Sequence, residues 1–178
     1  GHYAEMPLSG NVVLGDTKAD RQSLGQIIKN FIHKSGISSK NVAVSLPSSR
    51  VFLTVIDLDK LPPDEMNKAI YYQADTYIPT IPDKSKIDWA VIGDSPKGSQ
   101  KVEVLLSSVL NDFIEARLDM IEGAGFNVVA FEPVSIALTR SILAVDAATP
   151  QMVLNIDSKA TDLDIAMNGV PRLMRDGI

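Results

Sequence analysis

The sequence predicts a mixed α/β fold organised around a β-α-β-β-α-β segment at residues 51–133. Short runs rich in β-branched residues have the length of strands, and two longer stretches carry apolar residues at helical spacing. Polar turns such as residues 94–99 separate them. The predicted strands are residues 51–59, 86–94, 101–110 and 126–133, with helices after the first and third strands. This order predicts a ferredoxin-like module, a four-stranded sheet with both helices on one face.

The two predicted helices each have one apolar stripe. The first stripe contains Met66, Ala69, Ile70, Gln73, Ala74 and Tyr77, and the second contains Leu110, Phe113, Ile114, Arg117, Leu118 and Ile121. Acidic pairs at Asp64/Glu65 and Asp112/Glu115 lie in the first turns, where negative charge offsets the helix dipole. We therefore interpret these carboxylates as structural.

Further elements are predicted on both sides of this segment. Before it, we expect a short strand at residues 11–14, a helix capped by Asp20 and ended by a left-handed Gly36, and a strand at residues 41–47. After it, Pro133 is expected at the first position of another helix. The final stretch predicts a three-stranded meander (residues 152–157, 162–167 and 170–176) with Asn168-Gly169 as a hairpin turn.

The composition excludes several classes of function. The chain has 178 residues, 45% of them hydrophobic and 22% charged, which is enough apolar material for a core. A net charge of -5 argues against binding to a nucleic acid backbone. The absence of Cys excludes disulfides and thiolate metal sites and is compatible with the cytoplasm. No apolar run is long enough to cross a membrane.

Residues that could carry catalysis are few. The chain has two His residues, and His33 near a helix end is expected to be solvated or to cap the helix. Ser48 and Ser49 have no base nearby in the sequence and suit a turn. Trp89 in a predicted strand is interpreted as a core residue, and no metal site is expected.

One stretch has a more specific layout. Residues 155–165 read as a strand, a tight polar turn and a second strand, the arrangement of a hairpin loop that cradles a phosphate in actin-like ATPases. In such a loop an Asp-x-Gly start lets the backbone approach the phosphate, and Thr and Asp on the far side hold water or Mg²⁺.

These features together resemble the PilM family of type IV pilus assembly, which is close to the division protein FtsA and has an actin-like fold. The matching stretches are residues 41–47, 69–79, 101–106, 123–126, 131–133 and 161–165, which follow in the family's order. The resemblance implies a fragment centred on subdomain 1C: residues 3–50 resemble part of subdomain 1A, 51–133 subdomain 1C, 134–150 a helix and linker, and 151–178 part of subdomain 2A.

The phosphate loop departs from the family pattern. The family's loop aligns with Asn155, Asp157, Ser158, Thr161 and Asp162, so Asn155 replaces the acid and Asp157 the glycine. A carboxylate facing a phosphate is repulsive, and loss of glycine removes the close backbone approach. We therefore expect this chain to bind no cofactor and to be no enzyme, although the full-length family uses ATP and Mg²⁺.

The resemblance implies a cytoplasmic adaptor, peripheral to the inner membrane through its partner, that docks the N-terminal peptide of the inner-membrane protein PilN beside other pilus assembly proteins. The expected peptide-binding residues are Leu46, Ser48, Arg50, Phe52, Tyr71, Tyr72 and Ile78, whereas Tyr77 is expected in the core. Alternatives are an ATP-binding switch, an FtsA-like division scaffold and a ferredoxin-like regulatory module. Residues 151–178 could also pair with the strand at 42–47, in the same chain or by strand exchange in a homo-oligomer.

Overall fold

The structure is a computed structural model that describes residues 3–8, 17–79, 82–144, 146–147, 149–156 and 161–175. The fold is mixed α/β, as the sequence predicts. The chain divides into two compact units, residues 1–44 with 112–131 and residues 45–111 with 132–178, each described separately below. The strand predicted at residues 11–14 lies outside the described residues.

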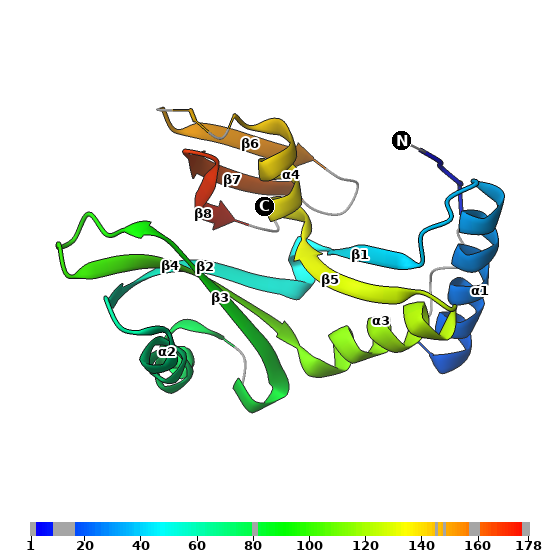
Figure 1. Cartoon of the computed structure of the whole chain (residues 1–178), viewed down its shortest axis with the longest axis horizontal. Coiled ribbons are helices and arrows are strands. Elements are labelled where there is room, and N and C mark those ends of the chain that lie inside the picture. Colours follow the sequence, from blue (N-terminus) through cyan, green and yellow to red (C-terminus); the bar gives the residue numbers. More distant parts are fainter. Residues whose placement is uncertain are drawn as a thin grey trace. The chain divides into compact units, whose positions relative to one another are not determined.

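Helix α1 (Lys18–Lys34) and most of helix α3 (Asn111–Gly123) belong to the first unit (Figure 1). The sequence predicts Asp20 as the N-cap of α1, and this prediction is wrong. Thr17 caps the helix, and Asp20 occupies the third position of a capping box, where its carboxylate accepts from the Thr17 backbone N–H at 3.1 Å. Gly36 follows the C-cap with a φ of +74°, which confirms the predicted left-handed helix end.

Strands β1 (Asn41–Leu46) and β5 (Asn127–Pro133) form a two-stranded sheet. In the first unit the backbone N–H of Asn127 donates to the carbonyl of Lys40 at 2.8 Å. This pairing corrects the prediction that the strand before Pro133 completes a four-stranded sheet. Among the described strands β1 pairs only with β5, so the expected pairing of residues 151–178 with β1 in the same chain is wrong as well.

The predicted module is reduced to a three-stranded antiparallel sheet, β2-β4-β3, in the second unit. Its strands are β2 (Val51–Asp59), β3 (Ser85–Asp94) and β4 (Lys101–Leu110), and helix α2 (Pro63–Tyr77) packs on one face (Figure 1). The core contains Ile56, Leu58, Met66, Ile70, Ala74, Ile78, Val102, Val104 and Leu106. Helix α2 packs on this sheet within the second unit, whereas the second predicted helix, α3, belongs for the most part to the other unit.

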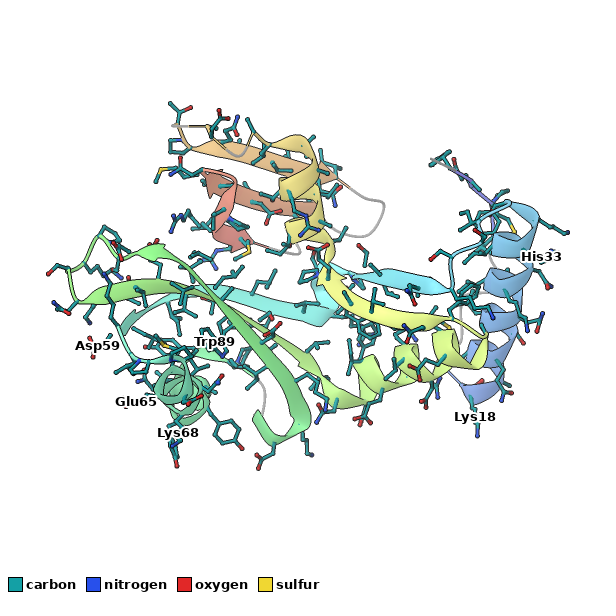
Figure 2. The ribbon with its side chains drawn as sticks, viewed as in Figure 1. Lys18, His33, Asp59, Glu65, Lys68 and Trp89 are labelled. Atoms are coloured by element: carbon teal, nitrogen blue, oxygen red, sulfur yellow. The ribbon has the colours of Figure 1, made fainter. Side chains whose placement is uncertain are left out.

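Two short turns, the first turn of α2 and Trp89 complete the description of this sheet and its helix. The 3-10 turns η1 (Ser48–Arg50) and η2 (Pro82–Lys84) precede β2 and β3. Asp64 and Glu65 lie in the first turn of α2, as predicted for structural carboxylates. Trp89 is half-buried against the core, as predicted, and its indole N–H donates to Asn67 at 2.9 Å (Figure 2).

The C-terminal meander forms as predicted, with strands β6 (Gln151–Ile156), β7 (Thr161–Met167) and β8 (Val170–Arg175) in antiparallel order. Asn168 and Gly169 both have positive φ, 55° and 70°, which confirms the predicted two-residue turn. Helix α4 (Val134–Ile142) packs against β7 and β8, with Pro133 as its N-cap, one position earlier than predicted. Arg172 of β8 pairs with Glu103 of β4.

Candidate docking site

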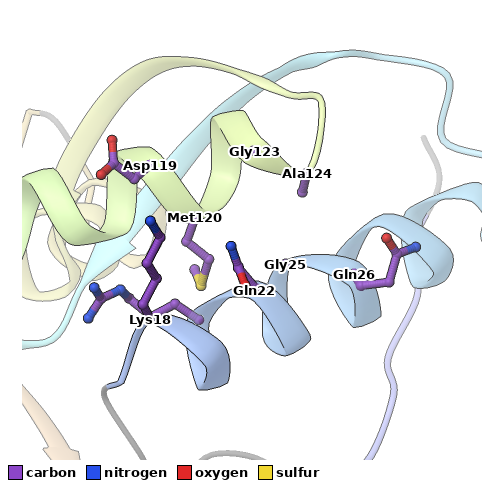
Figure 3. Close-up of a pocket in the computed structure, with 9 residues that line it drawn as sticks. Lys18, Gln22, Gly25, Gln26, Asp119, Met120, Gly123 and Ala124 are labelled. Carbon is purple, nitrogen blue, oxygen red and sulfur yellow. The ribbon is translucent and has the colours of Figure 1, made fainter.

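A groove lies between α1 and α3 within the first unit (Figure 3). Its volume is about 470 Å³, in the range of sites that hold small ligands or a few peptide side chains. The lining residues from α1 are Lys18, Arg21, Gln22, Gly25 and Gln26, and those from α3 and its end are Asp119, Met120, Gly123 and Ala124. Figure 3 shows Met120 extending from α3 toward α1.

Gly25 sets the distance between the two helices. It is buried, and a Cβ built there would lie 3.0 Å from the Met120 carbonyl oxygen and 3.6 Å from the Ala124 side chain. A contact of this length is tighter than nine in ten real Cβ contacts, so a larger residue would require the Met120 backbone to move by a few tenths of an ångström. The small residues therefore form the floor of the groove.

The walls combine amide, charged and apolar groups. Gln22 and Gln26 each offer N–H donors and a carbonyl acceptor, and Gln26 donates to Asn30 at 3.0 Å on the same helix. Lys18 and Arg21 place cations in the first turn of α1, and Asp119 faces the groove from α3. Because backbone amides of an extended peptide need both donors and acceptors, this lining suits a short peptide with an apolar side chain against Met120.

The sequence analysis missed this groove. None of the residues predicted to bind a peptide lines it. The signal that could have revealed it is Gly25, because a glycine inside a helix costs about 1 kcal/mol relative to alanine and often has a packing reason.

Three of the predicted peptide-binding residues are buried inside the second unit. Leu46 is 3% exposed, Ser48 5% and Ile78 5%, and Ile78 belongs to the core under α2. A partner cannot reach these side chains in this structure, so the expectation that they contact a peptide does not fit their burial. Their physical role is packing and, for Ser48, hydrogen bonding within the chain.

The other predicted residues remain accessible to different degrees. Arg50 is exposed in η1, and Phe52 is half-buried against the core. Tyr71 and Tyr72 on α2 are 57% and 81% exposed, with ring centroids 6.4 Å apart in an edge-to-face arrangement. The Tyr71 hydroxyl donates to Asp83 at 2.9 Å. Tyr77 packs on the core, as predicted.

Two of the residues aligned with a phosphate loop, Asn155 and Asp162, take part in a buried polar contact. Asp162 is 5% exposed, and its Oδ2 accepts from the Ser48 hydroxyl at 2.9 Å and from the Asn155 amide at 3.3 Å. Thr161 is half-buried, and Asp157 and Ser158 lie outside the described residues. Asn155 and Asp162 are thus brought together, and both are directed at groups of the chain itself.

Two other predictions concern single residues and metals. His33 is exposed in the last turn of α1 (Figure 2), where a solvated or capping role was expected. In the described part of the chain, no group of three or more His, Asp or Glu residues could hold a metal ion. Likewise, none of the described helices is long and apolar enough to span a membrane.

Comparison with known proteins finds one matching family and solved structures with a similar fold. A family model described as type IV pilus assembly protein PilM matches residues 1–176. A solved structure of a PilM-PilN type IV pilus biogenesis complex is similar, with a TM-score of 0.84 and 23% identity, covering 98% of this chain and 53% of that chain.

A second solved structure is the cytoplasmic domain of EpsL, an inner membrane component of the type II secretion system of Vibrio cholerae. It matches with a TM-score of 0.54 and 14% identity, covering 88% of this chain and 56% of that chain. The chain therefore spans about half the length of each of these two structures. At these identities the two structures show a shared fold.

Proposed function

Because the chain belongs to the type IV pilus assembly protein PilM family, we propose that it serves as a docking protein in type IV pilus assembly. In this proposal it binds the short cytoplasmic N-terminal tail of a PilN-type inner-membrane protein in the α1–α3 groove, and it performs no catalysis. The observation that carries the proposal is the groove itself, whose amide-rich walls suit an extended peptide.

Two observations, one from comparison and one from the groove, support docking. The solved structure that matches over 98% of this chain is that of a PilM-PilN complex. The groove walls provide donors and acceptors at Gln22 and Gln26 and an apolar contact at Met120, the combination by which proteins hold an extended backbone and one anchoring side chain. The proposal places the protein on the cytoplasmic side of the inner membrane, attached through its partner.

The absence of catalysis is supported by the contacts of Asp162. Its Oδ2, at the position aligned with a phosphate loop, accepts hydrogen bonds from Ser48 and Asn155, so this oxygen is held by groups of the chain itself. Calorimetric titration with ATP and Mg²⁺ tests this part of the proposal, and binding in the micromolar range would contradict it.

The docking site is tested with a fluorescent peptide of the cognate PilN-type tail. We expect saturable anisotropy with a Kd of roughly micromolar order, as for short-peptide recognition. Gln22→Trp fills the groove from an exposed position, so it should weaken binding at least about tenfold by removing the volume that the peptide occupies. Ser23→Trp is the matched control, because Ser23 is exposed on the same helix outside the groove.

The same assay separates the groove from the tyrosine pair on α2. Tyr72→Ala should leave the affinity unchanged, because Tyr72 is 81% exposed and takes no part in the groove. If Tyr72→Ala abolishes binding while Gln22→Trp does not, the docking site is at the tyrosine pair and the groove assignment is wrong. No saturable binding by the unmodified chain would refute docking itself.

A further inference from the structure

Strand β3 lies at an edge of the β2-β4-β3 sheet and directs backbone groups outward. Among the described strands it pairs only with β4, whereas β2, the other outer strand, lies against β8. The backbone N–H of Trp89 donates to the carboxylate of its neighbour Asp88 at 2.9 Å and not to another strand. Because alternate residues of a strand direct their N–H and C=O groups to the same side, those of Ile87 and Trp89 face outward. Such an edge is a template for pairing with a further strand.

The charges along this edge are complementary to themselves. Lys86 and Asp88 are both exposed and, two positions apart, lie on the same face of β3. A twofold axis at Ile87 places Lys86 of one copy opposite Asp88 of the other, and Asp88 opposite Lys86, so an antiparallel pair of β3 strands has two pairs of opposite charges. Within the part of the chain that the structure describes, Lys86 forms no ion pair. The edge therefore matches a second copy of itself.

Neighbouring registers of the same pairing are less favourable. An axis at either Lys86 or Asp88 places two like charges directly opposite each other, which destabilises a strand pair. An axis one residue beyond Asp88 brings neither of these two charges opposite an opposite charge. An axis at Ala90 places Lys86 opposite Asp94, but Asp94 is already paired with Lys60 at 2.8 Å, and the ladder of β3 is irregular just before it. Charge therefore selects the register centred on Ile87.

We propose that β3 is a homodimerisation edge, at which two copies of the chain pair their β3 strands antiparallel about a twofold axis at Ile87. This pairing joins their two three-stranded sheets into one continuous sheet. On pairing, Asp88 exchanges its contact with the Trp89 N–H for Lys86 of the second copy, and the Trp89 N–H donates to a carbonyl of the facing strand. The inference does not depend on the α1–α3 groove or on its ligand.

The dimer is expected to be weak, because the contact is small. The pairing centred on Ile87 involves residues 85–89 of each copy, far fewer than the roughly 20 to 30 residues a side of a stable interface. We therefore expect a Kd on the order of 10 to 100 µM. Because Lys86 and Asp88 are exposed, their attraction is screened by salt, so raising the ionic strength from about 0.05 to about 0.5 M should weaken the dimer several-fold.

The experiment is sedimentation equilibrium of the 178-residue chain and of charge-reversed variants at low salt. Lys86→Glu and, separately, Asp88→Lys should each weaken the dimer at least about tenfold, because each turns both cross-strand pairs into like charges. An equimolar mixture of these two variants should dimerise as the unmodified chain does, since every charge then faces an opposite one. Lys68→Glu, the same change at an exposed position on α2, is the matched control and should leave the Kd unchanged.

Three outcomes would overturn the inference. The first is a monomer at every concentration up to about ten times the expected Kd. The second is failure of the two variants to dimerise when mixed, although urea unfolding shows that each is folded. The third comes from amide hydrogen exchange: if the amides of Ile87 and Trp89 become protected only when a PilN-type tail peptide is added, and not with rising chain concentration, the edge takes that peptide and not a second copy.

Discussion

The buried contact between Ser48 and Asp162 provides the sharpest test of how the second unit is held together. Both side chains are 5% exposed, and the Ser48 hydroxyl donates to Asp162 Oδ2 at 2.9 Å across 114 positions of sequence. Ser48→Ala removes this donor and leaves the amide of Asn155, at 3.3 Å, on the same oxygen. Because Oδ1 of Asp162 has no hydrogen-bond partner among the described residues, the carboxylate depends on the contacts at Oδ2.

A hydrogen bond to a carboxylate contributes about 1.5 to 3 kcal/mol, and a buried acceptor that loses its donor pays desolvation in addition. We expect Ser48→Ala to lower the free energy of unfolding by about 2 kcal/mol. Ser49→Ala is the matched control, because Ser49 is exposed in the same turn and should change the free energy by less than about 0.5 kcal/mol.

The assay is urea unfolding followed by the fluorescence of Trp89, which is half-buried against the core of the same unit. A double-mutant cycle with Asp162→Ala isolates the pair, and we expect a coupling of about 1 to 3 kcal/mol. If Ser48→Ala lowers the free energy of unfolding by the same amount in the Asp162→Ala background as in the unmodified chain, the two residues do not interact. The stabilising role of this hydrogen bond is then refuted.

Three further predictions concern the second unit. Ile70→Ala, at a residue 2% exposed in the core, should lower the free energy of unfolding by about 2 to 5 kcal/mol in the same urea assay. Gly169→Val should lower the free energy of unfolding by about 1 to 2 kcal/mol, because Gly169 has a φ of +70°. Gly98→Val is the control, at a glycine without positive φ, and an equal loss there would contradict this reason. Hydrogen bonds from Lys97 and Ser95 hold the pKa of Asp57 below its ordinary value. These bonds therefore stabilise the folded chain at pH values above the unfolded pKa of about 3.9, and this stabilisation is lost as the pH falls through the lower folded pKa. Asp57→Asn should therefore destabilise the chain at pH 7 and progressively less in acid, and a cost independent of pH would contradict the shift.

The position of the proposed docking site depends on packing that the sequence did not reveal. The aromatic residues Tyr71 and Tyr72 were predicted as contacts from their type, and they are exposed on α2, where neither lines the groove. The groove is formed by residues more than 90 positions apart on α1 and α3, none of them aromatic. Such a site depends on the close approach of two helices, which a local pattern does not encode.

The sequence alone determined the order and type of the elements, because helical and strand periodicity are local properties of neighbouring residues. The meander with its Asn168-Gly169 turn, the helix α2 and the strands of its sheet all follow from such patterns. Only the tertiary structure decided that β5 pairs with β1 and not with the β2-β4-β3 sheet, and that Asp162 contacts Ser48. Strand partners and buried hydrogen bonds join distant residues, and several pairings satisfy the same alternation of apolar residues, so the choice among them is made by the packing of the whole chain.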